Sequence, residues 1–89
     1  MIKTFRHQGL ENFFRSGSKA GIQPHHAIKL RVQLTQLEKA KAPNDMNAPG
    51  WRLHPLGDDR WSIWVNGNWH ITFAFEEGDV ILVDYLDYH

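Results

Sequence analysis

The second half of the chain alternates apolar and polar residues with a period of two, and this pattern constrains the fold more than any other feature. The alternation begins at Trp51 and is interrupted by turn-forming residues at 66–68 and 77–78. Gly-containing steps between apolar runs are typical of tight hairpins. Residues 51–89 are therefore predicted to form three strands and a terminal strand of an antiparallel sheet.

The loop at Asn66-Gly67-Asn68 sets the register of the central hairpin. A three-residue loop with a bulge pairs Val65 with Trp69 and gathers the large apolar side chains on one face. A two-residue Asn-Gly loop would instead place Ile63 beside His70 and break that face. The longer loop predicts a core face of Trp61, Ile63, Val65, Trp69, Ile71, Phe73 and Phe75.

The second turn signal, Glu77-Gly78, closes the next hairpin. A two-residue turn there pairs Phe75 with Val80 and Phe73 with Leu82. Because successive side chains of a strand alternate between the two faces, these pairs determine the face of every later residue.

Strict alternation then places the odd-numbered residues of the terminal strand, which we call the tail, on the face opposite the core. Asp87 and His89 are expected on that face, together with Arg60 and His70. Tyr88 is expected to point to the other side unless the end of the chain bends.

The first half of the chain has a short strand pattern followed by helical periodicity. Residues 2–5 alternate apolar and polar and predict a first strand. Residues 7–16 place three large apolar side chains on one helical face, and Gly17 is suited to close that helix in the left-handed conformation.

A second helix is predicted to begin near Pro24 and to reach about Lys41, since Pro is tolerated in a first helical turn. His25 and His26 are expected to be an exposed helix start. The proline-, asparagine- and glycine-rich segment 40–50 reads as a connection. The apolar stripe of this helix is expected in the core and consists of Ala27, Leu30, Leu34 and Leu37.

These elements predict a single α+β domain over residues 1–89, with helices covering the apolar face of the sheet. The opposite face stays partly open. Imidazoles and a carboxylate transfer protons near neutral pH, guanidinium groups stabilise phosphate charge, and an aromatic ring can stack on a base, so the open face suits RNA chemistry. Its expected members are Arg52, His54, Arg60, Trp64, His70, Asp87 and His89.

A metal site is the competing interpretation of the same histidines. It is less favoured, because no helical His-Glu-x-x-His spacing and no cysteine is present, and Arg60 would oppose a bound cation. No cofactor is implied. The lack of cysteine and of any long apolar run indicates a soluble, cytoplasmic protein.

The formal charge of the chain is zero, but the two halves differ strongly. Residues 1–41 carry eight Lys or Arg against two acids, a net charge of +6, whereas residues 42–89 carry two against eight, a net charge of −6. A locally basic segment can bind phosphate whatever the total charge. A solvated helical face is the equally weighted alternative.

Four segments resemble one known family. The opening IKTFRHQGLENFFRSG, RLHPL at 52–56, WSIWVNGNWHITF at 61–73 and the final VDYLDYH are similar, in order and spacing, to the HigB branch of the RelE-like toxins of bacterial toxin–antitoxin systems. The resemblance implies a RelE-like, microbial-ribonuclease-like fold in the order β-α-α-β-β-β-β, with two helices on one face of an antiparallel sheet. It implies a metal-independent endonuclease that cuts mRNA in the ribosomal A site, inhibits translation and arrests growth.

The resemblance also assigns residues. His54, Asp87, Tyr88 and His89 stand at the family's catalytic positions, and Arg52, Arg60, His70 and Trp64 are expected to bind RNA or phosphate. Three features depart from similar toxins. His70 replaces an Arg, Gly57 replaces a Lys, and the stretch between Asp59 and Trp61 is shorter. Since Arg is always charged and an imidazole is not, attenuated activity is expected.

The implied partners are a HigA-type helix-turn-helix antitoxin, the 70S ribosome and mRNA, with DNA contacted only through the antitoxin and no membrane. The antitoxin would cover either the basic helical half or the catalytic face. The alternative function is a ParE-like toxin that binds DNA gyrase or another protein without cutting RNA.

Overall fold

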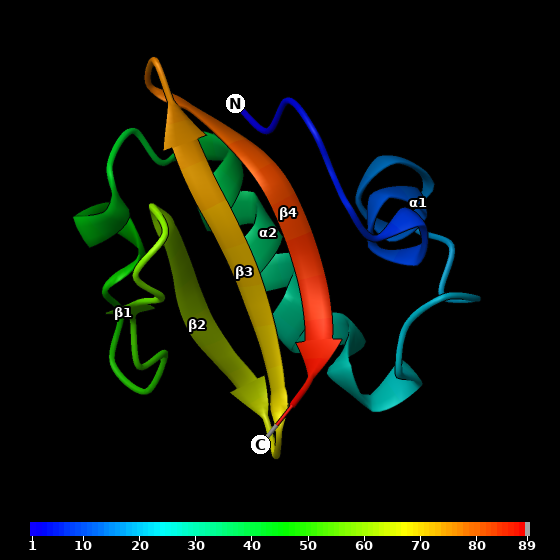
Figure 1. Cartoon of the computed structure of the whole chain (residues 1–89). Helices are drawn as coiled ribbons and strands as arrows, with labels where there is room; N and C mark the ends of the chain where they lie inside the picture. The colour runs from blue at the N-terminus through cyan, green and yellow to red at the C-terminus, as the bar shows by residue number, and fades with distance from the viewer. Residues whose placement is uncertain (89) are drawn as a thin grey trace.

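The structure, a computed structural model that describes residues 1–88, contains a four-stranded antiparallel sheet in the order β1-β2-β3-β4 (Figure 1). The strands are β1 (His54–Pro55), β2 (Arg60–Asn66), β3 (Trp69–Glu76) and β4 (Asp79–Asp87). With helices α1 (Gln8–Ser16) and α2 (Ala27–Lys39), they confirm the predicted α+β class.

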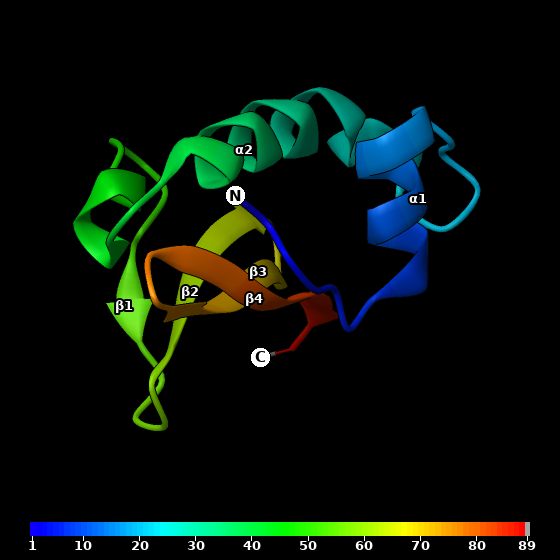
Figure 2. The ribbon, with the colours of Figure 1, turned by 90° about the horizontal axis from the view of Figure 1, so that it is seen from above.

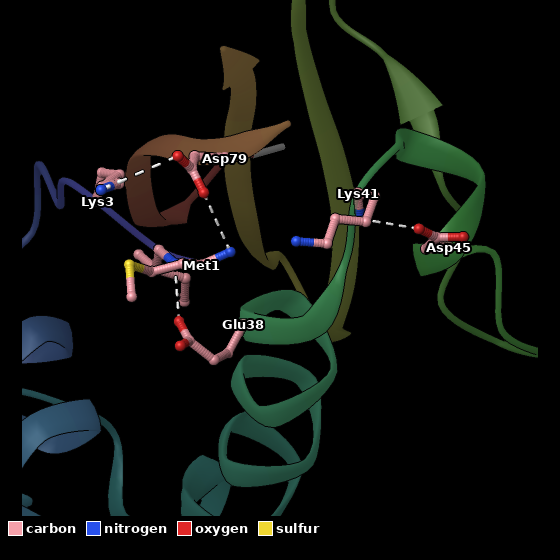
Figure 3. Close-up of polar contacts among 7 residues, drawn as sticks. Met1, Lys3, Glu38, Lys41, Asp45 and Asp79 are labelled. Carbon is pink, nitrogen blue, oxygen red and sulfur yellow. Dashed lines mark hydrogen bonds and ion pairs between the residues drawn. The ribbon is translucent and has the colours of Figure 1, made fainter. Parts of the chain in front are cut away.

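The predicted first strand is an extended segment that runs parallel to β4. It forms two isolated bridges, Ile2 to Val80 and Phe5 to Val83, rather than a continuous ladder. The Glu38 carboxylate of α2 accepts the Ile2 amide at 2.7 Å (Figure 3). The N-terminal segment is thereby tied to the sheet edge and to α2 at the same point.

Asp79 adds an electrostatic contact at this corner. Its carboxylate lies 3.5 Å from the Met1 amino group and 4.0 Å from the Lys3 ammonium (Figure 3). These groups are largely exposed, so the ion pairs stabilise the corner only weakly.

Helix α1 begins where the His7 side chain accepts the Leu10 amide, and it ends at Gly17, which has a φ of 83° as predicted. A side chain cannot replace hydrogen at Gly9, since a Cβ there would lie 2.6 Å from the Gly21 carbonyl oxygen. The helix therefore packs directly on the backbone of the following loop. It stands beside the β4 edge and rises to the level of α2 (Figure 2).

Helix α2 lies over one face of the sheet (Figure 2) and buries the whole predicted stripe. A 3-10 turn, Pro24–His26, precedes it. The expectation of an exposed helix start is wrong for His26, which is only 2% exposed. Its ring packs among aromatic side chains and lies 2.6 Å from the Tyr85 hydroxyl, which explains the burial.

The connection after α2 contains a short 3-10 turn, Pro43–Met46, whose last side chain is fully buried. No helix within residues 1–88 has the length and apolar character needed to cross a membrane.

The register of the central hairpin is as predicted over most of its length. Trp61 pairs with Phe73 and Ile63 with Ile71, and a bulge follows Trp64. At the turn the closing pair is Asn66 with Trp69 rather than the predicted Val65 with Trp69. The large apolar side chains nevertheless lie on the α2 side, in the core or packed against it.

In the last strand, the predicted alternation of side chains between the two faces of the sheet is wrong after Leu82. The pair Phe75 and Val80 forms as predicted, but the β3–β4 register shifts between Thr72 and Ala74, and Leu82 has a left-handed φ of 58°. A bulge inserts one extra residue, so every later side chain changes face. Val83 and Tyr85 are consequently buried in the core.

Candidate active site

The sheet face opposite α2 carries one row of polar side chains that runs across all four strands. His54 pairs with Ser62, Ser62 with Thr72, and Thr72 with Asp84. Side chains that face each other on neighbouring strands have Cβ atoms about 4.5–5.5 Å apart. The predicted open face therefore exists, with His54 at its β1 edge.

His54 is exposed, and its ring is oriented by the backbone. The Nδ1 atom lies 3.0 Å from the Arg52 carbonyl oxygen. A carbonyl only accepts hydrogen bonds, so Nδ1 carries the proton of this contact and Nε2 faces outward. In the neutral ring, Nε2 is then the nitrogen that takes up a proton from a ligand.

His70 is oriented in the same way on β3. Its Nδ1 donates to the Asn68 carbonyl oxygen over 3.0 Å, and its ring stacks on Tyr88 with centroids 4.4 Å apart. His70 is thus part of the open face, as predicted, and is in direct contact with Tyr88.

Tyr88 belongs to the open face, which corrects the expected orientation. Its amide donates to the Asn68 carbonyl oxygen at 2.9 Å, and its hydroxyl lies 3.2 Å from Ser62 Oγ. Ser62 is the register partner of His54. The hydroxyl of Tyr88 is therefore placed next to the β1 edge, where the His54 ring is exposed.

Asp87 pairs with Trp69 of β3 and therefore belongs to the same face of the sheet as the core residues, contrary to expectation. It is exposed at the strand end and still lines a shallow hollow of about 370 Å³ on the tail side of the sheet. His89 lies outside the described residues. The hollow is lined by Leu56, Arg60, Thr72, Leu86, Asp87 and Tyr88.

Arg60 is the cation of this hollow. Its Nε atom lies 3.1 Å from both carboxylate oxygens of Asp58, an exposed ion pair. Nη1 and Nη2 can still meet a ligand. The buried hydroxyl of Thr72 has no hydrogen-bond partner within residues 1–88. The hollow thus presents a cation beside Tyr88, with a buried, unpartnered hydroxyl in its lining.

Arg52 and Trp64 lie at the β1-side edge of β2, beside the open face rather than on its centre. The Arg52 guanidinium carbon is 4.2 Å from the centroid of the Trp64 ring, and Lys29 of α2 is 5.3 Å from it. Because cations lie over the indole ring, stacking on an RNA base is not the role that the contacts of Trp64 indicate. Sequence reasoning counted Lys29 in the basic half but did not predict its contact with Trp64, since nothing in the local pattern signals a contact 35 residues away.

Two other members of the site were also missed. Ser62 positions the Tyr88 hydroxyl, and the Asn68 carbonyl holds His70 and Tyr88 together. Ser62 was on the predicted polar face, so its position next to His54 was a usable signal. The Asn68 carbonyl gave no such signal, because a sequence does not show which backbone oxygens accept hydrogen bonds.

The face can bind a phosphate and exchange protons with it through oriented imidazole and phenol groups. Within residues 1–88, no three His, Asp or Glu side chains gather as metal ligands. Gly57, at the family's Lys position, has a φ of 90° and open space around it, so a Lys side chain there would be strained by the backbone rather than by crowding.

The comparisons with known proteins identify the family of this chain. The sequence model of a family described as RelE-like toxin of type II toxin-antitoxin system HigB matches residues 3–89. The chain is also 38% identical to the Endoribonuclease HigB of Proteus vulgaris, over 92 aligned positions that cover the full length of both proteins. The chain therefore belongs to the HigB-like branch of the RelE-like toxins of type II toxin–antitoxin systems.

Proposed function

We propose that this toxin is an endoribonuclease that cuts mRNA in the A site of the 70S ribosome and thereby inhibits translation. The observation that carries the proposal is the anchoring of Tyr88 on the open face, between His70 and the register partner of His54. The name of the Proteus vulgaris relative, an endoribonuclease, supports the same activity.

RNA supplies its own nucleophile for this reaction. The ribose 2′-oxygen attacks the neighbouring phosphorus, the bond from phosphorus to the 5′-oxygen breaks, and a 2′,3′-cyclic phosphate and a 5′-hydroxyl remain. One group takes the proton from the 2′-hydroxyl, and another gives a proton to the leaving 5′-oxygen. The proposed proton-transfer groups are His54, Asp87 and His89.

The remaining groups hold the RNA. Tyr88, fixed by Ser62, contacts the strand beside the cut. Arg60 and His70 stabilise the phosphate charge that develops during the attack, and Arg52 binds a neighbouring phosphate. All these steps use protein groups only, and the reaction as written is independent of metal.

Cleavage of a defined mRNA on purified 70S complexes tests the proposal. Replacing His54 by Ala should lower the single-turnover rate about 10²–10⁴-fold, the usual contribution of one acid–base group. His25→Ala is the matched control, since this exposed imidazole lies outside the open face. Fragments with a 2′,3′-cyclic phosphate identify the chemistry, and full activity of His54→Ala would refute it.

The family match favours this nuclease over a ParE-like toxin that binds DNA gyrase. Primer extension on RNA from induced cells separates the two functions. A nuclease leaves defined ends within coding sequences. A gyrase poison leaves transcripts uncut and induces the DNA-damage response.

The family is defined by a toxin–antitoxin system, so an antitoxin is the partner of this chain. We propose that it is a HigA-type helix-turn-helix protein in the cytoplasm, which alone contacts DNA, and that it covers the basic helical half. Ile28 and Val32 on the outer side of α2 are 84% and 54% exposed beside Arg31. Antitoxin binding that survives Lys19→Glu and Arg31→Glu would contradict this surface.

A further inference from the structure

The Trp64 ring is a meeting point of three segments that are distant in sequence. Arg52 lies over it from the turn before β1, and Lys29 from the first turn of α2. The indole Nε1 donates to the Gly67 carbonyl oxygen at 2.8 Å, which fixes the ring plane. Both cations therefore contact one indole ring whose orientation is fixed by the β2–β3 turn.

The backbone of Trp64 holds the same two segments. Its amide donates to the Trp51 carbonyl oxygen at 2.7 Å, and its carbonyl accepts the Gln33 amide group at 2.9 Å. Gln33 stands one helical turn after Lys29, and Trp51 directly precedes Arg52. The positions of both cations are thus determined by the fold rather than by the flexible side chains alone.

Arg52 is connected to the proposed catalytic face. Its carbonyl oxygen accepts Nδ1–H of His54, and its backbone has a left-handed φ of 53°, an uncommon conformation for a non-glycine residue. One turn therefore orients the His54 imidazole and directs the guanidinium over Trp64. Trp64 in turn pairs with His70 across β2 and β3.

Within the described residues, no carboxylate pairs with the two cations at this edge. Arg15 and Arg60 each form an ion pair with a carboxylate, whereas within residues 1–88 neither Lys29 nor Arg52 does. Two cations within 5.3 Å of one ring centroid repel each other, and a nearby anion relieves the repulsion. A phosphodiester has the required charge and several acceptor oxygens.

We propose that Lys29 and Arg52, positioned by Trp64, bind one phosphate of the mRNA strand next to the cleaved bond. The inference rests on the proposed nuclease function. The strand would leave the open face past His54 and cross the β2 edge toward α2. The mRNA is favoured over ribosomal RNA because the Arg52 carbonyl orients His54 and Trp64 is the register partner of His70.

Salt dependence of cleavage on 70S complexes gives the first test. Each lost phosphate contact lowers the salt slope by about 0.7–0.9, so the decline in kcat/KM between 50 and 200 mM salt should be about threefold smaller in Lys29→Met. Lys39→Met, on the last turn of the same exposed helix, should keep the wild-type slope. Lys29→Arg should restore it.

Methylphosphonate substitution gives the second test and identifies the RNA. Neutralising single mRNA phosphates on either side of the cut should slow the wild type at one position. At that position Lys29→Met and Arg52→Met should show no further loss. Trp64→Leu should remove the same sensitivity, whereas a purely structural role would lower only the melting temperature, measured in parallel by circular dichroism.

The outcomes separate the two proposals. If the wild type cuts mRNA but Lys29→Met and Lys39→Met have equal slopes, or if no phosphate is coupled to Lys29, the subsite is overturned and the nuclease remains. A slope change without coupling to any mRNA phosphate assigns the contact to ribosomal RNA and overturns the mRNA subsite. Absence of cleavage by the wild type overturns the nuclease itself.

Discussion

The ring of Tyr88 stacks on the ring of His70, with centroids 4.4 Å apart and planes inclined by 24°. This contact joins the last described residue of the chain to the position where the family resemblance predicts an Arg. Because a planar guanidinium also stacks on aromatic rings, an Arg at position 70 can keep the contact and add a permanent charge.

We expect His70→Arg to raise ribosome-dependent cleavage by at least about tenfold. A charge-assisted contact to a developing phosphate dianion typically contributes about 10²–10³ in rate, and the imidazole already supplies part of it. Single-turnover rates on 70S complexes measure the effect, with His70→Gln as the uncharged control. Equal rates for His70→Arg and wild type would mean that Arg60 already provides the charge.

The bulge at Leu82 predicts that a β-branched residue destabilises the protein more at position 82 than at the neighbouring position 81. A Val side chain is strongly disfavoured at a φ of 58°, so Leu82→Val should lower the free energy of unfolding by about 1–3 kcal/mol. Urea denaturation measures this loss. Ile81→Val, the adjacent position without a left-handed backbone, should cost about 0.5–1.5 kcal/mol at most. Equal stability of Leu82→Val and wild type would contradict the strained bulge.

The close approach of α1 to its following loop predicts that Gly9→Ala is destabilising. Ala normally stabilises a helix relative to Gly, but here its Cβ would lie 2.6 Å from the Gly21 carbonyl oxygen. We expect a loss of about 1–3 kcal/mol in the free energy of unfolding. Asn12→Ala, on the exposed side of α1, controls for helix propensity, and a more stable Gly9→Ala protein would show that the loop yields easily.

Stability should fall in acid because of His26. Burial, followed by the charge of His25, lowers the pKa of His26 below its ordinary value of 6.5. The unfolded chain therefore takes up this proton more readily, so the contribution is fully present above about pH 6.5 and is lost as the pH falls through and below that value.

Hydrogen bonding at His26 acts in the same direction. The Tyr85 hydroxyl accepts the Gln23 amide at 3.3 Å and lies 2.6 Å from His26 Nδ1, so its own proton is available for donation to the neutral ring. Burial raises the pKa of Tyr85, which stays a donor at neutral pH. Melting temperatures between pH 7.5 and 5 should decrease less in His26→Phe than in wild type. His25→Ala should retain a decrease, and parallel profiles for His26→Phe and wild type would exclude this role.

Elements with strong local signals were predictable from the sequence. The α2 stripe, the Gly17 cap and the pairs Trp61–Phe73 and Ile63–Ile71 were all correct, because periodicity and turn chemistry act over short distances. The open face with His54 and His70 followed from the same register. These predictions needed no knowledge of contacts between distant segments.

The tail and the β2 edge could not be predicted in the same way. Leu82 is an unusual residue for a left-handed conformation, and Thr4 Oγ1 stabilises the bulge by accepting the Leu82 amide at 2.8 Å. A contact over 78 residues leaves no local pattern. The burial of His26 likewise depends on Tyr85, a tertiary partner that alternation alone assigned to the wrong face.

The carbonyl oxygen of Asn68 receives both the ring proton of His70 and the amide proton of Tyr88. A main-chain oxygen, which every amino acid supplies, therefore positions both the His70 ring and Tyr88. Inserting or deleting a single residue between positions 66 and 69 would therefore displace both groups at once. The length of this turn sets the positions of His70 and Tyr88 together.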